Sequence, residues 1–448
     1  MGRKIHKRIA MVLLLVSLCV ALLSGCMSIS ADDLYSLPQL SEEYLLLQSH
    51  INSILNQGAE LSPLTGGVNR QAVQLIDLDG DGVDEVLAFF SFPSSSTLTL
   101  YIFKAEDKGY SIAEVIQGIG TAFESVRFVD MDGDGVMEIV VGWQMGPALR
   151  HLEIFSIRDY HAVSIMRTEY TELTEFDLTG NGNNDIIVVR SPTQESGAVI
   201  AVYTLMPDGE IVLAEAKLST GIEMFVRVLT GRLTDGVPAV FIESDGRFED
   251  GGIITDICVF LEEGLVNITV KGSNGVSEET IRTHMNSSDI NGDGVIEIPM
   301  PRLLRAQSET DYYAIDWYAF GSNGHSSLAL TTYHNNNDEW YLILPFDWRG
   351  MVSLRREDGI AGERTVVFSS ILEDDDIYND FLRIYKITGD LRENRATLPG
   401  RLRLTEEGSA VYAFELLAPP NSFGLTFDEH LIRSNFRLMY LEWLVGSG

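Results

Sequence analysis

One nine-residue pattern occurs four times in this chain, each time between apolar segments, and it limits the available folds more than any other feature. Every copy has oxygen-bearing side chains at positions 1, 3, 5 and 9 and glycines at positions 4 and 6. The copies, called loops 1 to 4 below, are Asp77–Glu85, Asp130–Glu138, Asp177–Asp185 and Asp289–Glu297. Because glycine tolerates positive φ, the chain can turn back sharply there and alternate side chains can converge. The pattern predicts four compact loops rich in oxygen atoms.

Such oxygen atoms, with a backbone carbonyl near position 7, suit a hard cation that takes six to eight oxygen ligands at about 2.3–2.6 Å. We expect this cation to be calcium. The expected ligands occupy positions 1, 3, 5, 7 and 9 of the loops: Asp77, Asp79, Asp81, Val83, Glu85, Asp130, Asp132, Asp134, Val136, Glu138, Asp177, Thr179, Asn181, Asn183, Asp185, Asp289, Asn291, Asp293, Val295 and Glu297.

Two other calcium loops begin in the same way, and position 12 excludes both. An EF-hand needs a bidentate glutamate there, and dockerin-type loops also want an acid. This chain has only apolar residues at that position: Ala88, Val141, Val188 and Met300. The residues after position 9 are β-rich and show no helical period, as in Val86–Phe90. Each loop is therefore expected to join two strands.

The loops resemble the FG-GAP/VCBS repeat of integrin-like β-propellers, whose loops have the form Asp-x-Asp-x-Asp-Gly-x-x-Asp/Glu. The resemblance covers roughly residues 70 to 300 and implies a mainly β fold, a propeller of four-stranded repeats of about 50 residues. The alternative is that the loops are only solvated turns, for which Asp, Asn and Gly are the usual residues. Loops 1 and 2 argue against it, because at least four carboxylates in one turn repel without a cation. Loop 3, with two acids, fits it best.

The loops begin 53, 47 and 112 residues apart, so one copy is missing near residue 233. The stretch Leu229–Pro238 keeps turn glycines but few acids, and we expect it to keep the fold and bind no ion. Five repeats are too few for a seven-bladed ring. Either Tyr312–Trp348 supplies a further blade, or the ring is small or incomplete; an open stack of sheets is the alternative, and it would expose sheet edges at its ends.

The first thirty residues have the features of a targeting signal. Four basic residues precede an apolar stretch, Met11–Leu23, which is short for a membrane span and is followed by Leu23-Ser24-Gly25-Cys26. This resembles a bacterial lipoprotein signal, which implies cleavage after residue 25 and acylation of Cys26. An ordinary secretory signal or an uncleaved anchor is the alternative. We expect a lipid-anchored protein on the extracytoplasmic face of a bacterial cell membrane.

Charge and cysteine content limit the partners. The chain has 32 basic and 65 acidic residues, and such a surface repels nucleic acid. The expected partners are the membrane, through lipid on Cys26, and an extracellular protein or glycan.

Cys258 is the one cysteine outside the first 26 residues. It lies in an apolar run and is expected to be a buried small hydrophobe.

The remaining segments complete the expected organisation. Apolar residues at steps of three and four in Glu42–Gln57 predict an amphipathic packing helix. Strands are expected at Met351–Arg355, Arg364–Ser369, Phe381–Ile387 and Ala410–Leu417, with a closing helix at Asp428–Leu444. The expected divisions are a signal peptide (1–25), a tether (26–40), the helix and lead-in (41–70), propeller repeats (71–300), a further blade or linker (301–348) and a C-terminal α+β or all-β module (349–448).

No catalytic motif is visible. The eight histidines form no zinc-binding pair, and no nucleophile elbow, P-loop or dinucleotide fingerprint occurs. The acidic run Glu373–Asp376 is expected to be a solvated loop, and the aromatic residues between 312 and 348 are expected to pack in a core rather than stack on sugars. We therefore expect a non-catalytic binding or scaffolding module. The alternatives are a surface polysaccharide hydrolase or lyase with structural calcium, or a propeller that only positions the C-terminal module.

Overall fold

A computed structural model describes residues 42–439, apart from residues 108, 247–251, 284, 306, 308–309, 358 and 373–376. The described chain is mainly β and forms six antiparallel sheets of four or five strands. The predicted signal peptide, Cys26, the tether and the acidic run at 373–376 lie outside the described residues. Within the described part, no helix has the length and apolar character needed to cross a membrane.

The first four sheets are made of strands that follow one another along the chain. The first sheet contains β1 (Glu60–Leu61), β2 (Val73–Ile76), β3 (Glu85–Phe92), β4 (Thr97–Glu106) and β5 (Gly109–Gln117). The second contains β6 (Ala122–Val129), β7 (Glu138–Gln144), β8 (Arg150–Arg158) and β9 (His161–Tyr170). The third contains β10 (Glu172–Phe176), β11 (Asp185–Arg190), β12 (Val199–Leu205) and β13 (Ile211–Lys217). The fourth contains β14 (Ile222–Arg232), β15 (Pro238–Gly246), β16 (Ile253–Leu261) and β17 (Gly264–Asn267).

The last two sheets take up the rest of the chain. The fifth contains β18 (Ile298–Leu303), β19 (Tyr313–Phe320), β20 (Ser326–Asn335), β21 (Trp340–Leu344) and, from the C-terminal end, β27 (Phe436–Leu438). The sixth contains β22 (Val352–Glu357), β23 (Glu363–Leu372), β24 (Ile377–Thr388), β25 (Arg401–Glu407) and β26 (Ala410–Leu416). The short helices are η1 (Glu278–Thr280), η2 (Phe346–Trp348), α4 (Arg392–Ala396) and α5 (Glu429–Asn435).

Neighbouring sheets stack face to face, and the sequence of the inner strands explains why. The second strand of each early repeat, such as β3, β7 and β11, is an apolar run buried over nearly its whole length. A strand with two apolar faces needs a partner on each side. One core joins the first and second sheets, others join the second to the third and the third to the fourth, and Cys258 lies in the last of these, as predicted.

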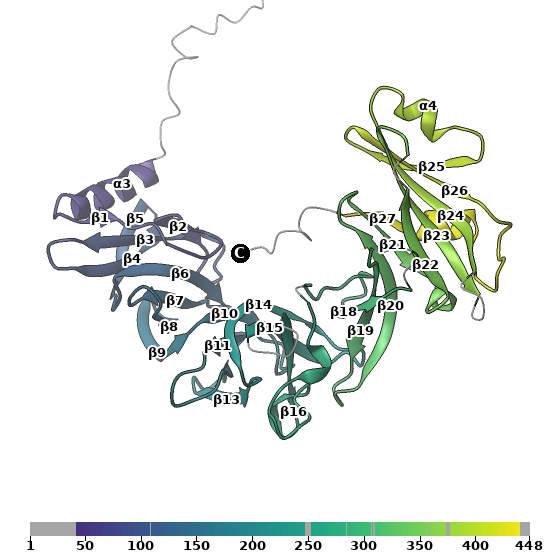
Figure 1. Cartoon of the computed structure of the whole chain (residues 1–448). Coiled ribbons are helices and arrows are strands. Elements are labelled where there is room, and N and C mark those ends of the chain that lie inside the picture. Colours follow the sequence, from purple (N-terminus) through teal and green to yellow (C-terminus); the bar gives the residue numbers. More distant parts are fainter. Residues whose placement is uncertain are drawn as a thin grey trace, which may run out of the picture.

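The six sheets follow an open arc, with the first and sixth sheets at its two ends (Figure 1). Helix α3 (Glu42–Leu55) covers the outer face of the first sheet, where Leu47 and Ile54 pack against residues of β3. At the other end, Ala396 of α4 packs on the outer face of the sixth sheet. No strand pairing of the described residues joins the two end sheets. Helices thus cover the two faces that ring closure would bring together.

The fifth and sixth sheets share one large aromatic core. Trp340 and Trp348 are buried in it, as expected for packing residues. The closing helix is shorter than the predicted Asp428–Leu444: α5 ends at Asn435, and the chain continues as β27, which pairs with β21. The strand forms because Phe436 is buried in the shared core.

Candidate metal-binding loops

All four loops have the same backbone arrangement. In each loop, the amide of position 2 donates a hydrogen bond to the carboxylate at position 9: Leu78 to Glu85 at 3.0 Å, Met131 to Glu138 at 3.0 Å, Leu178 to Asp185 at 2.9 Å and Ile290 to Glu297 at 3.1 Å. The aspartate at position 1 accepts two or more amide hydrogen bonds from positions 4 to 6. The loops are therefore folded in the same way before any ion is considered.

Glycines at positions 4 and 6 make this turn possible. In loop 1, Gly80 and Gly82 have φ of 73° and 86°, a region that other residues adopt only with strain. At position 5, the side-chain oxygen accepts the amide of position 7, as Asp81 does from Val83 at 2.8 Å. The amide of position 7, the residue whose carbonyl group is a predicted ligand, makes this hydrogen bond in all four loops.

The carboxylates converge in loops 1 and 2. Each of two triads offers carboxylate oxygens that all lie within 4.8 Å of one another: Asp77, Asp79 and Glu85 in loop 1, and Asp130, Asp132 and Glu138 in loop 2. Among the described residues these are the two acidic groups with this geometry. The position-5 residues Asp81 and Asp134 are not part of the triads. Three hard oxygen donors per loop fit a calcium ion.

Electrostatics in loop 2 supports this fit. Burial, together with repulsion from Asp132, Asp134 and Asp130, raises the pKa of Glu138 to about 7. In loop 1, burial likewise raises the pKa of Glu85. A carboxylate is costly to ionise when it is buried beside like charges. A divalent cation at the triad would reverse that cost.

Loop 3 satisfies its carboxylate in another way. Asp185 is completely buried and accepts hydrogen bonds from the hydroxyl groups of Thr204, at 2.5 Å, and Thr179, at 3.3 Å. Neutral donors therefore surround the oxygen that a cation would need, and Thr179 supplies no acid at position 3. Of the four predicted sites, this one has the weakest structural support.

In loop 4 an amide replaces the missing acid. The side-chain amide of Asn291 donates to Asp293 at 2.9 Å and to Glu297 at 3.3 Å. Burial and repulsion from Asp293 and Asp289 nevertheless raise the pKa of Glu297 to about 7. In its support for a cation site, loop 4 is therefore intermediate. It ranks below loops 1 and 2, which have carboxylate triads, and above loop 3, where hydroxyl groups donate to the carboxylate.

The missing fifth copy has the expected form. A short turn joins β14 to β15 at residues 233–237, and its acid, Asp235, accepts hydrogen bonds from the amide and hydroxyl of Ser322 at 3.0 and 2.6 Å. This carboxylate ties the fourth sheet to the fifth sheet. This copy therefore keeps the turn between two strands, as predicted; that it binds no ion stays a prediction.

Successive loops touch one another. The carbonyl of Leu78 in loop 1 accepts a hydrogen bond from the amide of Met137 in loop 2 at 2.8 Å. A Cβ atom placed on Gly80 would lie 2.8 Å from the carbonyl oxygen of Gly135, and one on Gly133 would lie 2.7 Å from Oδ1 of Asn183 in loop 3. Loops 1, 2 and 3 therefore form a continuous row. A side chain added at Gly80 or Gly133 would collide with the next loop.

Tyr160 contacts the first site, and sequence reasoning missed it. It occupies the turn between β8 and β9 of the second sheet, and its hydroxyl lies 2.5 Å from Oδ2 of Asp79 and 3.0 Å from Oε1 of Glu85. The backbone there is unusual, with φ of 62° at a bulky residue. Lys104 lies over the ring, 4.0 Å from its centroid. No local signal marks Tyr160, because only the stacking of the two sheets brings it to loop 1.

We expect Tyr160→Phe to lower the melting temperature of the calcium-free protein, by the equivalent of about 1.5–3 kcal/mol for a lost hydrogen bond to a carboxylate. The loss should be smaller in calcium, because the ion would then balance Asp79 and Glu85. Thermal melts with and without chelator test this. Tyr313→Phe is the matched control, since Tyr313 is 48% exposed and lies far along the chain in β19; equal effects of the two variants would contradict the role of Tyr160.

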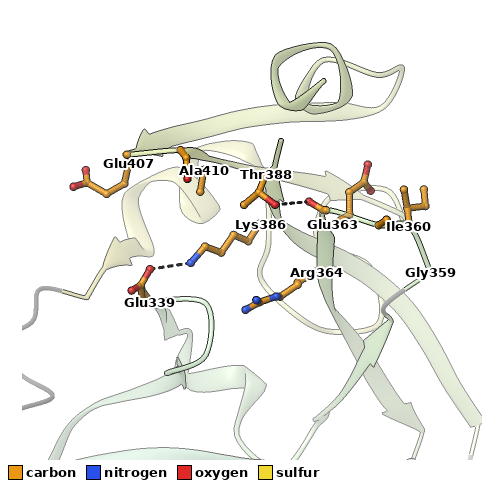
Figure 2. Close-up of a pocket in the computed structure, with 13 residues that line it drawn as sticks. Glu339, Gly359, Ile360, Glu363, Arg364, Lys386, Thr388, Glu407 and Ala410 are labelled. Atoms are coloured by element: carbon orange, nitrogen blue, oxygen red, sulfur yellow. Dashed lines mark hydrogen bonds and ion pairs between the residues drawn. The ribbon is translucent and has the colours of Figure 1, made fainter. Parts of the chain in front are cut away.

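A cavity of about 810 Å³ lies beside the sixth sheet and is shown in Figure 2. Four of its five charged lining residues form ion pairs: Lys386 pairs with Glu339 at 2.8 Å, Arg364 with Asp338 at 2.8 Å, and Glu363 with Arg401 at 2.9 Å. The lining includes no histidine, cysteine or tyrosine.

Comparisons with known proteins single out the same two loops. Residues 77–141, which contain loops 1 and 2, match the family model of the FG-GAP-like repeat. A search of curated proteins finds no match. Among solved structures, the chain is similar to the crystal structure of an exotype rhamnogalacturonan lyase, YesX, with 12% sequence identity and a TM-score of 0.29. That similarity covers 72% of this chain and 58% of the lyase chain, less than two thirds of its length.

Proposed function

We propose that the chain is a calcium-binding surface lipoprotein whose propeller-like sheets act as a non-catalytic binding or scaffolding module for protein or glycan. The observation that carries the proposal is the convergence of three carboxylates in each of loops 1 and 2. Both loops lie within the residues that match the FG-GAP-like repeat.

Calcium has a structural role in this proposal. Each ion would hold a loop between the first two strands of its sheet and, through the contacts between loops, align one sheet with the next. Affinities on the order of 10⁻⁴–10⁻³ M suit extracellular calcium. The ion would thereby stabilise the stack that presents the loops and cavities to a partner.

The proposed location rests on the sequence before residue 27. Lipid on Cys26 would hold the chain at the extracytoplasmic face of a bacterial membrane, and the net charge of −33 would keep it away from nucleic acid.

Cys26→Ala should abolish lipid attachment and move the protein from the membrane fraction to the soluble fraction, because the acyl chains would be its anchor. Metabolic labelling with a fatty acid, followed by fractionation, measures both. Cys258→Ala is the matched control, since Cys258 is completely buried. Undiminished label on the Cys26 variant would refute the anchor.

The competing function, a polysaccharide hydrolase or lyase, predicts a different outcome in one experiment. The chain is incubated with acidic and neutral polysaccharides in calcium or in chelator, and retention and the length of the polysaccharide are both measured. We expect calcium-dependent retention of a polysaccharide or a surface protein without shortening of the polysaccharide. New chain ends in the calcium sample, lost on chelation, would establish the enzyme instead.

A further inference from the structure

A second cavity, of about 460 Å³, opens on the fifth sheet and differs from the acidic loops in its charge. Met300 and Arg302 of β18 line it together with Asp316 and Tyr318 of β19, and Arg349, which follows η2, reaches over it. We call this cavity the arginine pocket.

Asp316 is fully satisfied by its neighbours. Its side chain is 3% exposed and accepts hydrogen bonds from Nε and Nη2 of Arg302 at 2.8 and 3.3 Å, from Thr331 at 2.8 Å and from Nη2 of Arg349 at 3.0 Å. Burial would raise the pKa of Asp316, but the hydrogen bonds from Arg302 and Thr331 and the charges of both arginines hold it below its ordinary value. Asp316 is therefore an ionised anchor that neutralises only one of two guanidinium groups.

Several donors at the pocket are left for another molecule. Nη1 of Arg302 and both Nε and Nη1 of Arg349 donate to none of the described residues, and the two side chains are 27% and 39% exposed. The Tyr318 hydroxyl accepts a hydrogen bond from Arg349 at 3.2 Å, so its own hydrogen remains available. Each of these remaining N–H groups can donate a charge-assisted hydrogen bond to a carboxylate oxygen.

The charge of the pocket sets the ligand's charge. Two arginines against Asp316 leave one positive charge, and the remaining acid, Glu279, is paired with Lys271 at 2.8 Å. This surplus stands out in a chain with twice as many acidic as basic residues. It balances a single negative charge, whereas a dianion would leave the pocket with one net negative charge.

Folding alone does not require the second arginine. Arg302 already gives Asp316 two hydrogen bonds, and Thr331 gives a third. Arg349 adds a fourth at the cost of placing a second cation beside the first. Met300 and the Tyr318 ring line the same pocket and add apolar surface to it.

We propose that the arginine pocket binds a small monocarboxylate of the size of one uronic acid ring, with the carboxylate on Arg349 and Arg302 and the ring against Met300 and Tyr318. A cavity of this volume suits a ligand of that size. This gives the proposed binding role a ligand class. It rests on that role but not on calcium, because loops 1 and 2 lie in other sheets.

The test is calorimetric titration of the full chain with D-glucuronate, with D-glucose as the neutral ring and with inorganic sulfate as a dianion. We expect glucuronate to bind and glucose and sulfate not to bind. Arg349→Gln should weaken glucuronate binding about 10-fold or more, the loss typical of a charge-assisted hydrogen bond. Arg190→Gln, which removes a similarly exposed arginine paired with Glu215 on the third sheet, should leave binding unchanged.

The outcomes separate this proposal from the calcium proposal. Absence of glucuronate binding, sulfate binding as tight as glucuronate binding, or equal affinities of the Arg349 and Arg190 variants would each overturn it, whatever calcium does to the melting temperature. If Arg349→Gln lowers the yield of folded protein, Tyr318→Phe replaces it, because that variant keeps both arginines on Asp316 and removes only the hydroxyl that Arg349 contacts. It should also weaken glucuronate binding, and unchanged binding would overturn the proposal.

Discussion

Asp132→Ala should lower the stability of the protein in calcium but not in chelator. In calcium, it should remove most of the stabilisation from loop 2, which for one site amounts to about 2.7 kcal/mol when free calcium is 100 times its dissociation constant. In chelator, the variant should be as stable as the parent or more stable, because Glu138 loses the repulsion of Asp132. Melting curves in both conditions measure the two effects.

Thr179→Ala is the matched comparison for this experiment. Thr179 occupies the same position of loop 3, and its hydroxyl makes one long hydrogen bond to Asp185, at 3.3 Å. We expect a small loss that is the same with and without calcium, since neutral donors already satisfy Asp185. Equal melting temperatures for the two variants in calcium would refute the ranking of the loops.

The calcium-free protein should become less stable as the pH rises from about 5 to 8. The raised pKa values of Glu138 and Glu297, about 7 against an ordinary 4.5, mean that the folded state holds more protons in this window. Their stabilising contribution is fully present below about pH 4.5 and is lost as the pH rises through about 7, with a size of about 1–3 kcal/mol per group. Calcium needs the ionised carboxylates, so its stabilisation should instead increase with pH.

Glu138→Gln provides the control for the pH experiment. The amide oxygen can still accept the hydrogen bond from the Met131 amide, but the side chain no longer titrates. In chelator, the variant should therefore lose part of the pH dependence, as measured by denaturant unfolding at several pH values. Parallel pH curves for the parent with and without calcium would contradict the electrostatic description of the loops.

Sequence reasoning located the loops and the strands after them because both depend on local chemistry. Glycine positions, acid spacing and apolar runs act within nine or ten residues, and the same hydrogen bonds recur in loops 1 to 4. The packing helix is also local in origin, and α3 begins at the predicted residue, Glu42.

What was missed depends on contacts between distant segments. Tyr160 reaches loop 1 only through the stacking of two sheets, and Thr204 satisfies loop 3 from another strand. The strand β25 pairs with β26, an arrangement set by the packing of the sixth sheet. Local sequence does not predict ring closure either, because closure depends on the angles between sheets and not on the number of repeats.

The most direct measurement is a calorimetric titration of the chelator-treated chain with calcium, followed by melts with and without the ion. We predict at least two bound ions, with loops 1 and 2 filled first, and a clear rise in melting temperature. Asp132→Ala should lower the stoichiometry by one. If the chain binds no calcium and its melting temperature does not change, the loops are solvated turns and the calcium-binding account is wrong.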